Sequence, residues 1–117
     1  MKVVREVDQL IEAGFISADM REVIEKVSKK FSVALTPQLV ELINSSSVQD
    51  KEALLLQFLP SEQELKISKE ELVDPIGDIN HTTVKGVVHR YPDRCLLMPI
   101  LACAVYCRFC FRRDTVG

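Results

Sequence analysis

The chain has 117 residues, enough for one domain with a modest core, and its 47% apolar and 27% charged residues are typical of a folded protein. A formal charge of −2 argues against a strongly basic nucleic-acid-binding surface, and no apolar stretch is long enough to cross a bilayer. The N-terminus gains charge too early for a secretory signal. We therefore expect a cytoplasmic protein that binds neither nucleic acid nor membrane.

The beginning of the chain has helical periodicity. A short amphipathic run around Leu10 is expected to end at Gly14, and Ser17 suits the N-cap of a second helix. We interpret the apolar stripe of that second helix as core or subunit contact. Its residues are Met20, Val23, Ile24, Val27 and Phe31.

Two further helices are expected before residue 60. Thr36 followed by Pro37 predicts a helix start, because proline suits the first helical position. Another helix is expected over 51–58, stopped by Pro60. Capping-box patterns then predict two short helical turns, at Ser61 with Glu64 and at Ser68 with Glu71.

The helical period is lost after the loop D-P-I-G-D at 74–78. Residues 84–89 are compatible with a short extended piece, and Tyr-Pro-Asp at 91–93 is a turn signal. The mostly apolar run 94–101 predicts a strand buried on both faces of a parallel sheet, although Pro99 cannot donate to a sheet ladder.

All four cysteines lie in the last quarter of the chain, and three of them are closely spaced. Cys103, Cys107 and Cys110 form the pattern C-x3-C-x2-C on a segment that directly follows the predicted strand. A disulfide framework would spread its cysteines along the chain, so this clustering indicates a metal centre or reactive thiols. Three thiolates on one loop favour an iron–sulfur cluster that keeps one iron open.

Other interpretations of the cysteines remain open. A structural zinc site would need a fourth ligand from Cys95, His89 or His81, and a segment with ordinary thiols would bind no metal. Zinc sites generally show two separated ligand pairs instead of one tight triplet. Cys95 lies inside the predicted strand and is expected to be a small buried hydrophobic residue, and both histidines are expected in loops or at the surface.

The motif C-A-V-Y-C-R-F-C at 103–110 resembles the signature of radical S-adenosylmethionine enzymes. Neighbouring motifs resemble the lysine 2,3-aminomutase family within that group, and the likeness covers about residues 50–117. The motifs are Q-F-L-P-S-E-Q-E-L at 57–65, D-P-I-G-D at 74–78, H-R-Y-P-D-R at 89–94 and F-R-R-D-T-V-G at 111–117.

The resemblance implies an α/β fold. A helical region over 1–78 would lead into the first strand and cluster loop of a radical S-adenosylmethionine (β/α) barrel over 79–117. A complete barrel takes about 250 residues, so the resemblance implies an N-terminal fragment of an isomerase that is inactive alone. The lysine that would bind pyridoxal phosphate, and the acidic residues that would select the substrate, are expected downstream of this stretch.

The resemblance also implies cofactors and their ligands. Cys103, Cys107 and Cys110 would hold a 4Fe–4S cluster, whose open iron would bind S-adenosylmethionine and cleave it to a radical. Phe109 occupies the family's aromatic position against the adenine. The radical would act on an amino acid attached to pyridoxal 5′-phosphate, and the amino group would move to the neighbouring carbon.

Four residues would serve the second cofactor and the substrate. Arg90, Tyr91 and Arg94 match the family region that reaches pyridoxal phosphate, and a guanidinium fork suits a phosphate. Arg112 matches the position that pairs with the substrate carboxylate. No residue of this stretch is assigned as a catalytic acid or base.

The implied partners are an amino acid and an electron donor of the flavodoxin or ferredoxin type, and a full-length protein could form a homo-oligomer. Lysine is the default substrate, but this stretch does not select it over glutamate or arginine. The alternative function is a small zinc-stabilised interaction module whose helices bind a partner.

Overall fold

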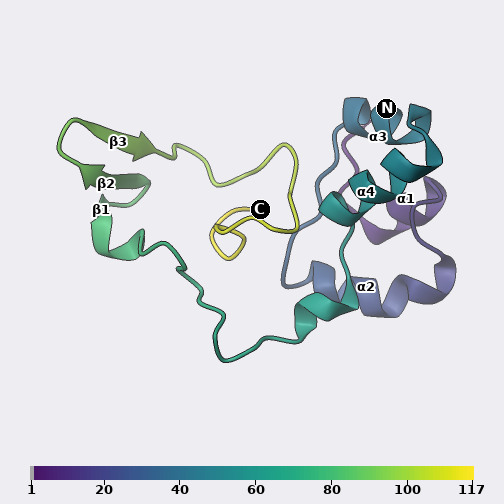
Figure 1. Ribbon diagram of the computed structural model, residues 1–117, viewed down its shortest axis with the longest axis horizontal. Helices are drawn as coiled ribbons and strands as arrows, with labels where there is room; N and C mark the ends of the chain where they lie inside the picture. Colours follow the sequence, from purple (N-terminus) through teal and green to yellow (C-terminus); the bar gives the residue numbers. More distant parts are fainter. Residues whose placement is uncertain (1) are drawn as a thin grey trace.

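The computed structural model describes residues 2–117 and shows a helical unit, a small antiparallel sheet, and an irregular C-terminal segment between them (Figure 1). The helical unit contains α1 (Val7–Glu12), η1 (Ala18–Met20), α2 (Arg21–Ser28), α3 (Pro37–Ser45), α4 (Val48–Phe58) and η2 (Glu62–Leu65), where η marks a 3-10 helix. The sheet follows η3 (Ile79–His81) and contains β1 (Thr82–Val84), β2 (Val87–Tyr91) and β3 (Arg94–Leu97).

The predicted termination of α1 by Gly14 is confirmed, since the helix ends at Glu12 and Gly14 lies in the turn that follows. This residue has a φ of +70°, which glycine adopts without steric cost. The Phe15 backbone N–H donates to the Leu10 carbonyl at 3.0 Å, and the Gly14 N–H donates to the Ile11 carbonyl at 2.9 Å. This pair of hydrogen bonds is the Schellman motif, which satisfies the last carbonyls of a helix.

The predicted start of α3 is also confirmed. Thr36 is the N-cap, and its side-chain oxygen accepts a hydrogen bond from the Leu39 backbone N–H at 3.3 Å. Pro37 occupies the first helical position, where its missing N–H costs nothing.

Helix α4 ends before Pro60 as predicted, but it begins three residues earlier than expected, at Val48. The reason is local, because the Ser47 side chain accepts from the Asp50 N–H at 3.2 Å and caps the helix. The Ser61–Glu64 capping box forms and starts η2. At Ser68, the predicted turn closes through a Glu71 N–H bond to the Ser68 carbonyl at 3.3 Å, but no helix follows.

Ser17 does not cap a helix through its side chain, and it precedes the short η1 turn instead of α2. The stripe after it is largely buried: Ile24, Val27 and Phe31 are at most 1% exposed, whereas Met20 is 37% exposed. One core cluster lies among α1, α2 and α3 and is formed by Val4, Val7, Leu10, Phe15, Ile24, Val33, Leu35, Val40 and Ile43.

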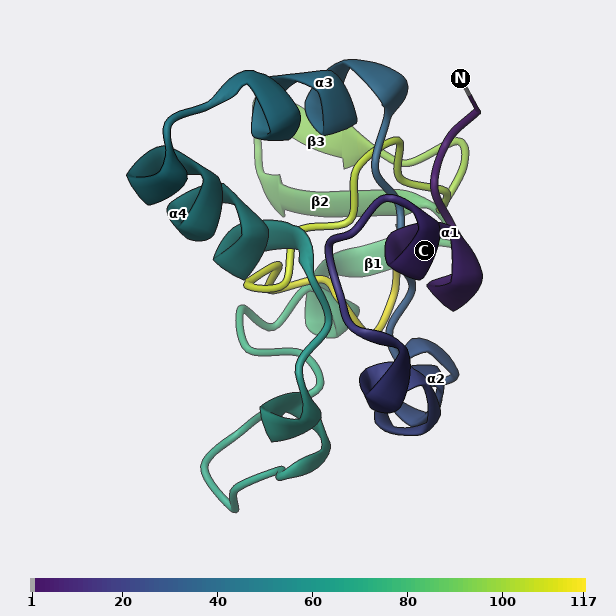
Figure 2. The same ribbon diagram turned by 90° about the vertical axis from the view of Figure 1, so that its right-hand side faces the viewer.

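The sheet is a meander in the order β1-β2-β3, with both pairs antiparallel. The turn between β1 and β2 uses Gly86 at a φ of +84°, and a side chain there would collide with the Met98 carbonyl. The turn between β2 and β3 contains Pro92 and Asp93, since Tyr91 pairs with Arg94. Seen from the helical side, the strands lie behind the helical unit (Figure 2).

The prediction for the run 94–101 is wrong in three respects. The strand ends at Leu97, it pairs antiparallel with β2, and all four of its residues are exposed. The turn at 91–93 explains the direction, because a two-residue turn joins adjacent strands as an antiparallel hairpin. Cys95 is therefore exposed and not buried as expected. Among residues 2–117, no helix is long and apolar enough to span a membrane.

Candidate functional site

The segment 98–117, which carries the three clustered cysteines, has no regular helix or strand. It runs from the end of β3 back to the helical unit and lies between that unit and the sheet (Figure 1). Residues 106–108 attach it to the helical unit through the backbone. The Tyr106 N–H donates to the Ala34 carbonyl at 3.0 Å, and the Arg108 N–H donates to the Gln57 carbonyl at 2.9 Å.

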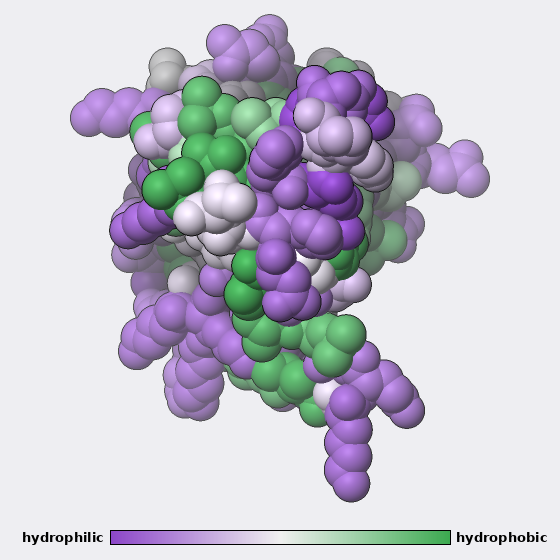
Figure 3. Space-filling view, turned by 90° about the vertical axis from the view of Figure 1, so that its left-hand side faces the viewer, coloured by the Kyte–Doolittle hydropathy of each residue, from purple (hydrophilic) through white to green (hydrophobic). Residues whose placement is uncertain are grey.

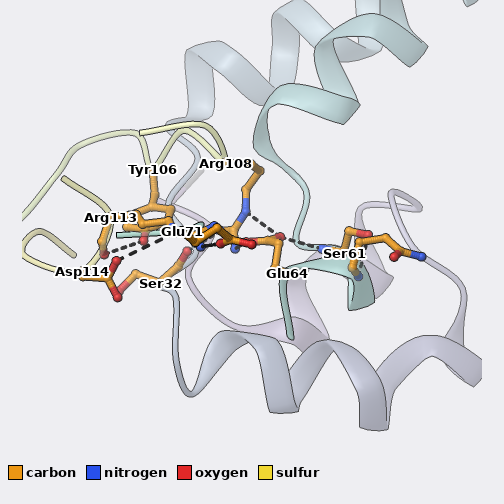
Figure 4. Close-up of polar contacts among 9 residues, drawn as sticks. Ser32, Ser61, Glu64, Glu71, Tyr106, Arg108, Arg113 and Asp114 are labelled. Carbon is orange, nitrogen blue, oxygen red and sulfur yellow. Dashed lines mark hydrogen bonds and ion pairs between the residues drawn. The ribbon is translucent and has the colours of Figure 1, made fainter. Parts of the chain in front are cut away.

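Tyr106 secures this attachment with its side chain. Only 2% exposed, it joins a second core cluster with Val27, Phe31 and Ala34. Its hydroxyl donates to the Arg113 carbonyl at 2.8 Å (Figure 4). Burial disfavours the phenolate and raises the pKa of Tyr106 to about 12. This tyrosine is therefore a structural part of the segment 98–117, which we call the cysteine loop.

Arg108, between the second and third cysteines, makes a two-pronged ion pair with Glu64 (Figure 4). Its Nε donates to Glu64 Oε1 at 3.1 Å and its Nη2 to Oε2 at 2.5 Å, while Nη1 donates to the Ser32 carbonyl at 2.7 Å. The two side chains are only 7% and 12% exposed. The Ser61 N–H also donates to Glu64 Oε1 at 2.8 Å, so the capping box of η2 orients the carboxylate that holds the loop.

The three clustered cysteines are half-buried and free. Cys107 stands between two buried neighbours that face the helical unit, and the Cys110 N–H donates to the Cys107 carbonyl at 3.2 Å in a tight turn. Burial raises the pKa of the Cys107 thiol, and the nearby Cys110 and Cys103 thiols raise it further. Cys107 thus lies close enough to Cys103 and Cys110 for their charges to influence it.

The donor set fits an iron–sulfur cluster in its chemistry. Three thiols lie on one partly exposed loop, and a positive iron centre would offset the repulsion that disfavours the Cys107 thiolate. Across residues 2–117, no three His, Cys, Asp or Glu side chains are gathered closely enough to hold a single metal ion. The ligand assignment of Cys103, Cys107 and Cys110 therefore stays a prediction.

A hollow of about 260 Å³ brings together all four residues predicted to bind the second cofactor and the substrate. We call it the arginine hollow, and it lies where β2 and β3 meet the cysteine loop. It is lined by Val88, Arg90, Tyr91, Arg94, Cys95, Leu96 and Arg112. Arg112, which lies 18 positions after Arg94 and 22 after Arg90, thus contributes a third guanidinium group to the same surface.

Asp78 bridges two of these arginines. Its Oδ1 accepts from Arg90 Nη2 at 3.0 Å, and its Oδ2 accepts from Arg112 Nε at 2.9 Å. The carboxylate is only 15% exposed. Burial is the largest influence on this group and favours its neutral form, but the two arginines together outweigh it and hold the pKa of Asp78 below its usual range.

Arg94 has a looser environment than the other two arginines. It stacks over the Tyr91 ring, with 4.4 Å between its guanidinium carbon and the ring centroid, and pairs with Asp93 at 3.1 Å. Both members of that ion pair are about two-thirds exposed, so the pair adds little to stability. Tyr91 is half-exposed and lines the hollow.

Phe109 and Cys110 line a second hollow, of about 320 Å³, between the cysteine loop and residues 70–75. Phe109 is 71% exposed, so an aromatic face stands next to a clustered cysteine without a covering side chain. Arg113 also lines this hollow and pairs with Glu71 at 3.0 Å.

Sequence reasoning missed three groups that the structure places at the site: Arg108, Tyr106 and Asp78. Arg108 and Tyr106 occupy the variable positions of the cysteine motif, and their only sequence signal was their place between cysteines. Asp78 appeared within the D-P-I-G-D motif, but its two arginine partners lie 12 and 34 residues away and no local pattern connects them.

Comparison with known proteins gives relatives for nearly the whole chain. It is 34% identical to an L-lysine 2,3-aminomutase of Fusobacterium nucleatum over 87% of the chain, and 33% identical to one of Methanococcus maripaludis over 97%. A glutamate 2,3-aminomutase of Clostridioides difficile is 32% identical over 97%. The chain spans about a quarter of the length of these curated relatives, at 24%, 27% and 26%. No family model matches the chain.

Proposed function

Since the chain belongs to the lysine 2,3-aminomutase family, we propose that it forms part of a radical S-adenosylmethionine isomerase and holds a 4Fe–4S cluster through Cys103, Cys107 and Cys110. The observation that supports the proposal most strongly is the attachment of the cysteine loop to the helical unit. The Arg108–Glu64 pair and the buried Tyr106 fix residues 106–108, and the three thiols remain partly accessible.

The two hollows beside the loop support separate roles for their residues. Phe109, exposed next to Cys110, would stack on the adenine of S-adenosylmethionine. In the arginine hollow, Arg90 and Arg94 would bind the phosphate of pyridoxal 5′-phosphate, and Tyr91 would contact it or its ring. Arg112 would pair with the carboxylate of the amino acid.

When bound, these cofactors would supply the radical chemistry that moves an amino group to a neighbouring carbon. The residues of this chain would position the reactants and exclude competing reactions. The substrate class is an amino acid: the lysine and glutamate relatives match the chain about equally well, so this stretch does not choose between them. An external one-electron donor of the flavodoxin or ferredoxin type would reduce the cluster. The division at 78/79 between helical region and barrel start stays a prediction.

Reconstitution tests the cluster assignment. The purified chain, incubated with iron and sulfide without oxygen, should give a brown species with a 4Fe–4S electron paramagnetic resonance after reduction. S-Adenosylmethionine should change that resonance, because its amino and carboxylate groups would bind the open iron. Cys103→Ala, Cys107→Ala and Cys110→Ala should each lose the signal, since each removes one of three ligands.

Cys95→Ala is the matched control, because this exposed thiol lies outside the cluster motif, and it should keep the full signal. Stoichiometric binding of colourless zinc, a requirement for Cys95 as a fourth ligand, or the absence of iron uptake would each contradict the proposal.

A further inference from the structure

The turn D-P-I-G-D at 74–78 ends in a carboxylate whose placement is fixed by the turn itself. The Asp74 side chain accepts two backbone hydrogen bonds, from the Asp78 N–H at 2.8 Å and from the Ile79 N–H at 2.8 Å. The Gly77 N–H closes the turn onto the Asp74 carbonyl at 3.2 Å. The backbone carrying Asp78 is therefore held by its own loop, independently of any arginine.

Arg90 and Arg112 come to Asp78 from different elements, and each uses only part of its guanidinium. Arg90 donates through Nη2 to Asp78 and to the Ile76 carbonyl, and Arg112 donates through Nε. A guanidinium has five N–H donors, so both arginines retain free donors for an anion. Seven of the described residues line the arginine hollow, and Asp78 is not among them. An anion in the hollow would not have to displace the carboxylate.

From this geometry we infer that Asp78 is a positioning residue: its carboxylate holds Arg90 and Arg112 together and directs their remaining N–H groups toward anions bound in the arginine hollow. This inference deepens the proposed function and rests on its assignment of these arginines to a phosphate and a carboxylate. It adds that the two anion contacts are coupled, because a shift of Asp78 moves both guanidinium groups. Asp78 also offsets the repulsion between two cations that share one hollow.

The alternative role for Asp78 is that of an internal competitor that occupies the arginines until an anion arrives. The two roles predict opposite changes in anion affinity when Asp78 is replaced. Removing a competitor, or simply removing a negative charge, should tighten anion binding. Removing a positioning residue should weaken it, because the free arginines must then be ordered by the anion itself.

The test measures binding of inorganic phosphate to the 117-residue chain. In Asp78→Asn, we expect the dissociation constant for phosphate to rise about tenfold, since two charge-assisted hydrogen bonds that order the arginines are weakened. The matched control is Asp93→Asn, which makes the same charge change beside the same hollow. It touches only the exposed Arg94 pair and should leave phosphate binding unchanged or slightly tighter. Equal or tighter binding by Asp78→Asn would overturn the inference.

A second readout follows the arginines directly. The Nε–Hε resonance of Arg112 in a ¹H–¹⁵N spectrum should shift in Asp78→Asn and stay in place in Asp93→Asn, because Arg112 Nε donates to Asp78. If Asp78→Asn does not fold, Asp78→Glu replaces it in the test. We expect Asp78→Glu to keep the resonance of a hydrogen-bonded Arg112 Nε–Hε. Its affinity for phosphate should lie between those of the parent and an Arg112→Ala variant. Parent-like phosphate binding with that resonance lost would overturn the inference.

These outcomes separate the inference from the proposed function. A parent chain that forms the cluster but binds no phosphate overturns the coupled anion site and leaves the thiol assignment standing. A parent chain that binds phosphate through an Asp78-dependent pair but takes up no iron overturns the cluster and leaves the arginine arrangement standing.

Discussion

At the scale of single residues, burial distinguishes side chains of the same type. Tyr106 and Tyr91 are the only tyrosines, and they differ in environment, with 2% and 50% of their surfaces exposed. The Tyr106 hydroxyl donates to the Arg113 carbonyl. The Tyr106 ring packs in the second core cluster, to which helix α2 contributes Val27. A residue inside the cysteine motif is thus also a core residue of the helical unit.

The titration of Tyr106 gives a test at this scale. Burial raises its pKa to about 12, so the folded state holds the proton more tightly than the unfolded chain, whose tyrosines titrate near 10. The stability linked to this group is fully present below about pH 10 and is lost as pH rises toward 12. Absorbance near 295 nm should show a late phenolate transition that Tyr106→Phe removes and Tyr91→Phe retains. A late transition that survives in Tyr106→Phe would contradict the assignment.

At the scale of elements, local signals set where helices begin and end, and long-range pairs attach the irregular segments to them. Helix α3 begins at its Thr36-Pro37 signal, and α1, whose last residue is Glu12, is terminated by the turn at Gly14. The cysteine loop has no element of its own and depends on contacts with the carboxylate of η2 and with the Ser32 carbonyl. Figure 4 shows Arg108 between Ser32 and Glu64, with Ser61 on the far side of Glu64.

Removing one partner of the buried Arg108–Glu64 pair is expected to destabilise the fold strongly. Arg108→Met should lower the free energy of unfolding by about 2–4 kcal/mol, because it leaves the Glu64 carboxylate, 12% exposed, without its cation. The double variant Arg108→Met with Glu64→Gln should recover part of this loss. Arg94→Met is the control, since its exposed pair is worth about 0–1 kcal/mol. Urea unfolding measures all three, and equal losses for Arg108→Met and Arg94→Met would contradict the prediction.

The whole molecule is more open than a compact domain of its length. Its radius of gyration is 16.2 Å, compared with roughly 13 Å for a compact domain of this size, and it extends over 47 × 32 × 24 Å. The view onto the sheet side shows apolar surface exposed among polar side chains (Figure 3). Exposed apolar residues of the sheet and of the segment after it include Val84, Leu96, Leu97, Ile100 and Leu101.

We expect no aminomutase activity from the 117-residue chain alone. It spans about a quarter of the length of its curated relatives, and the hollows beside the cysteine loop are open surfaces that do not exclude water. The assay would combine the chain with S-adenosylmethionine, pyridoxal phosphate, reductant and lysine or glutamate under anaerobic conditions. A full-length L-lysine 2,3-aminomutase serves as the positive control, and formation of a β-amino acid by the chain would refute the expectation.

The sequence by itself determined the features that depend on neighbouring residues. Gly14, Thr36-Pro37 and Pro60 mark helix limits through hydrogen bonds or clashes within a few positions, so local rules suffice to predict them. The spacing of the cysteines likewise singled out one loop as the candidate site.

The tertiary structure alone decided the strand arrangement and the pairs that hold the site. Leu96 and Leu97 form part of an exposed antiparallel strand because the turn before them folds β3 onto β2. The apolar composition of the run does not predict this pairing. Arg108 meets Glu64 across 44 positions, and Arg112 meets Asp78 across 34. Charged side chains carry no mark of their partner in the sequence, since ion pairs form wherever folding brings opposite charges within reach.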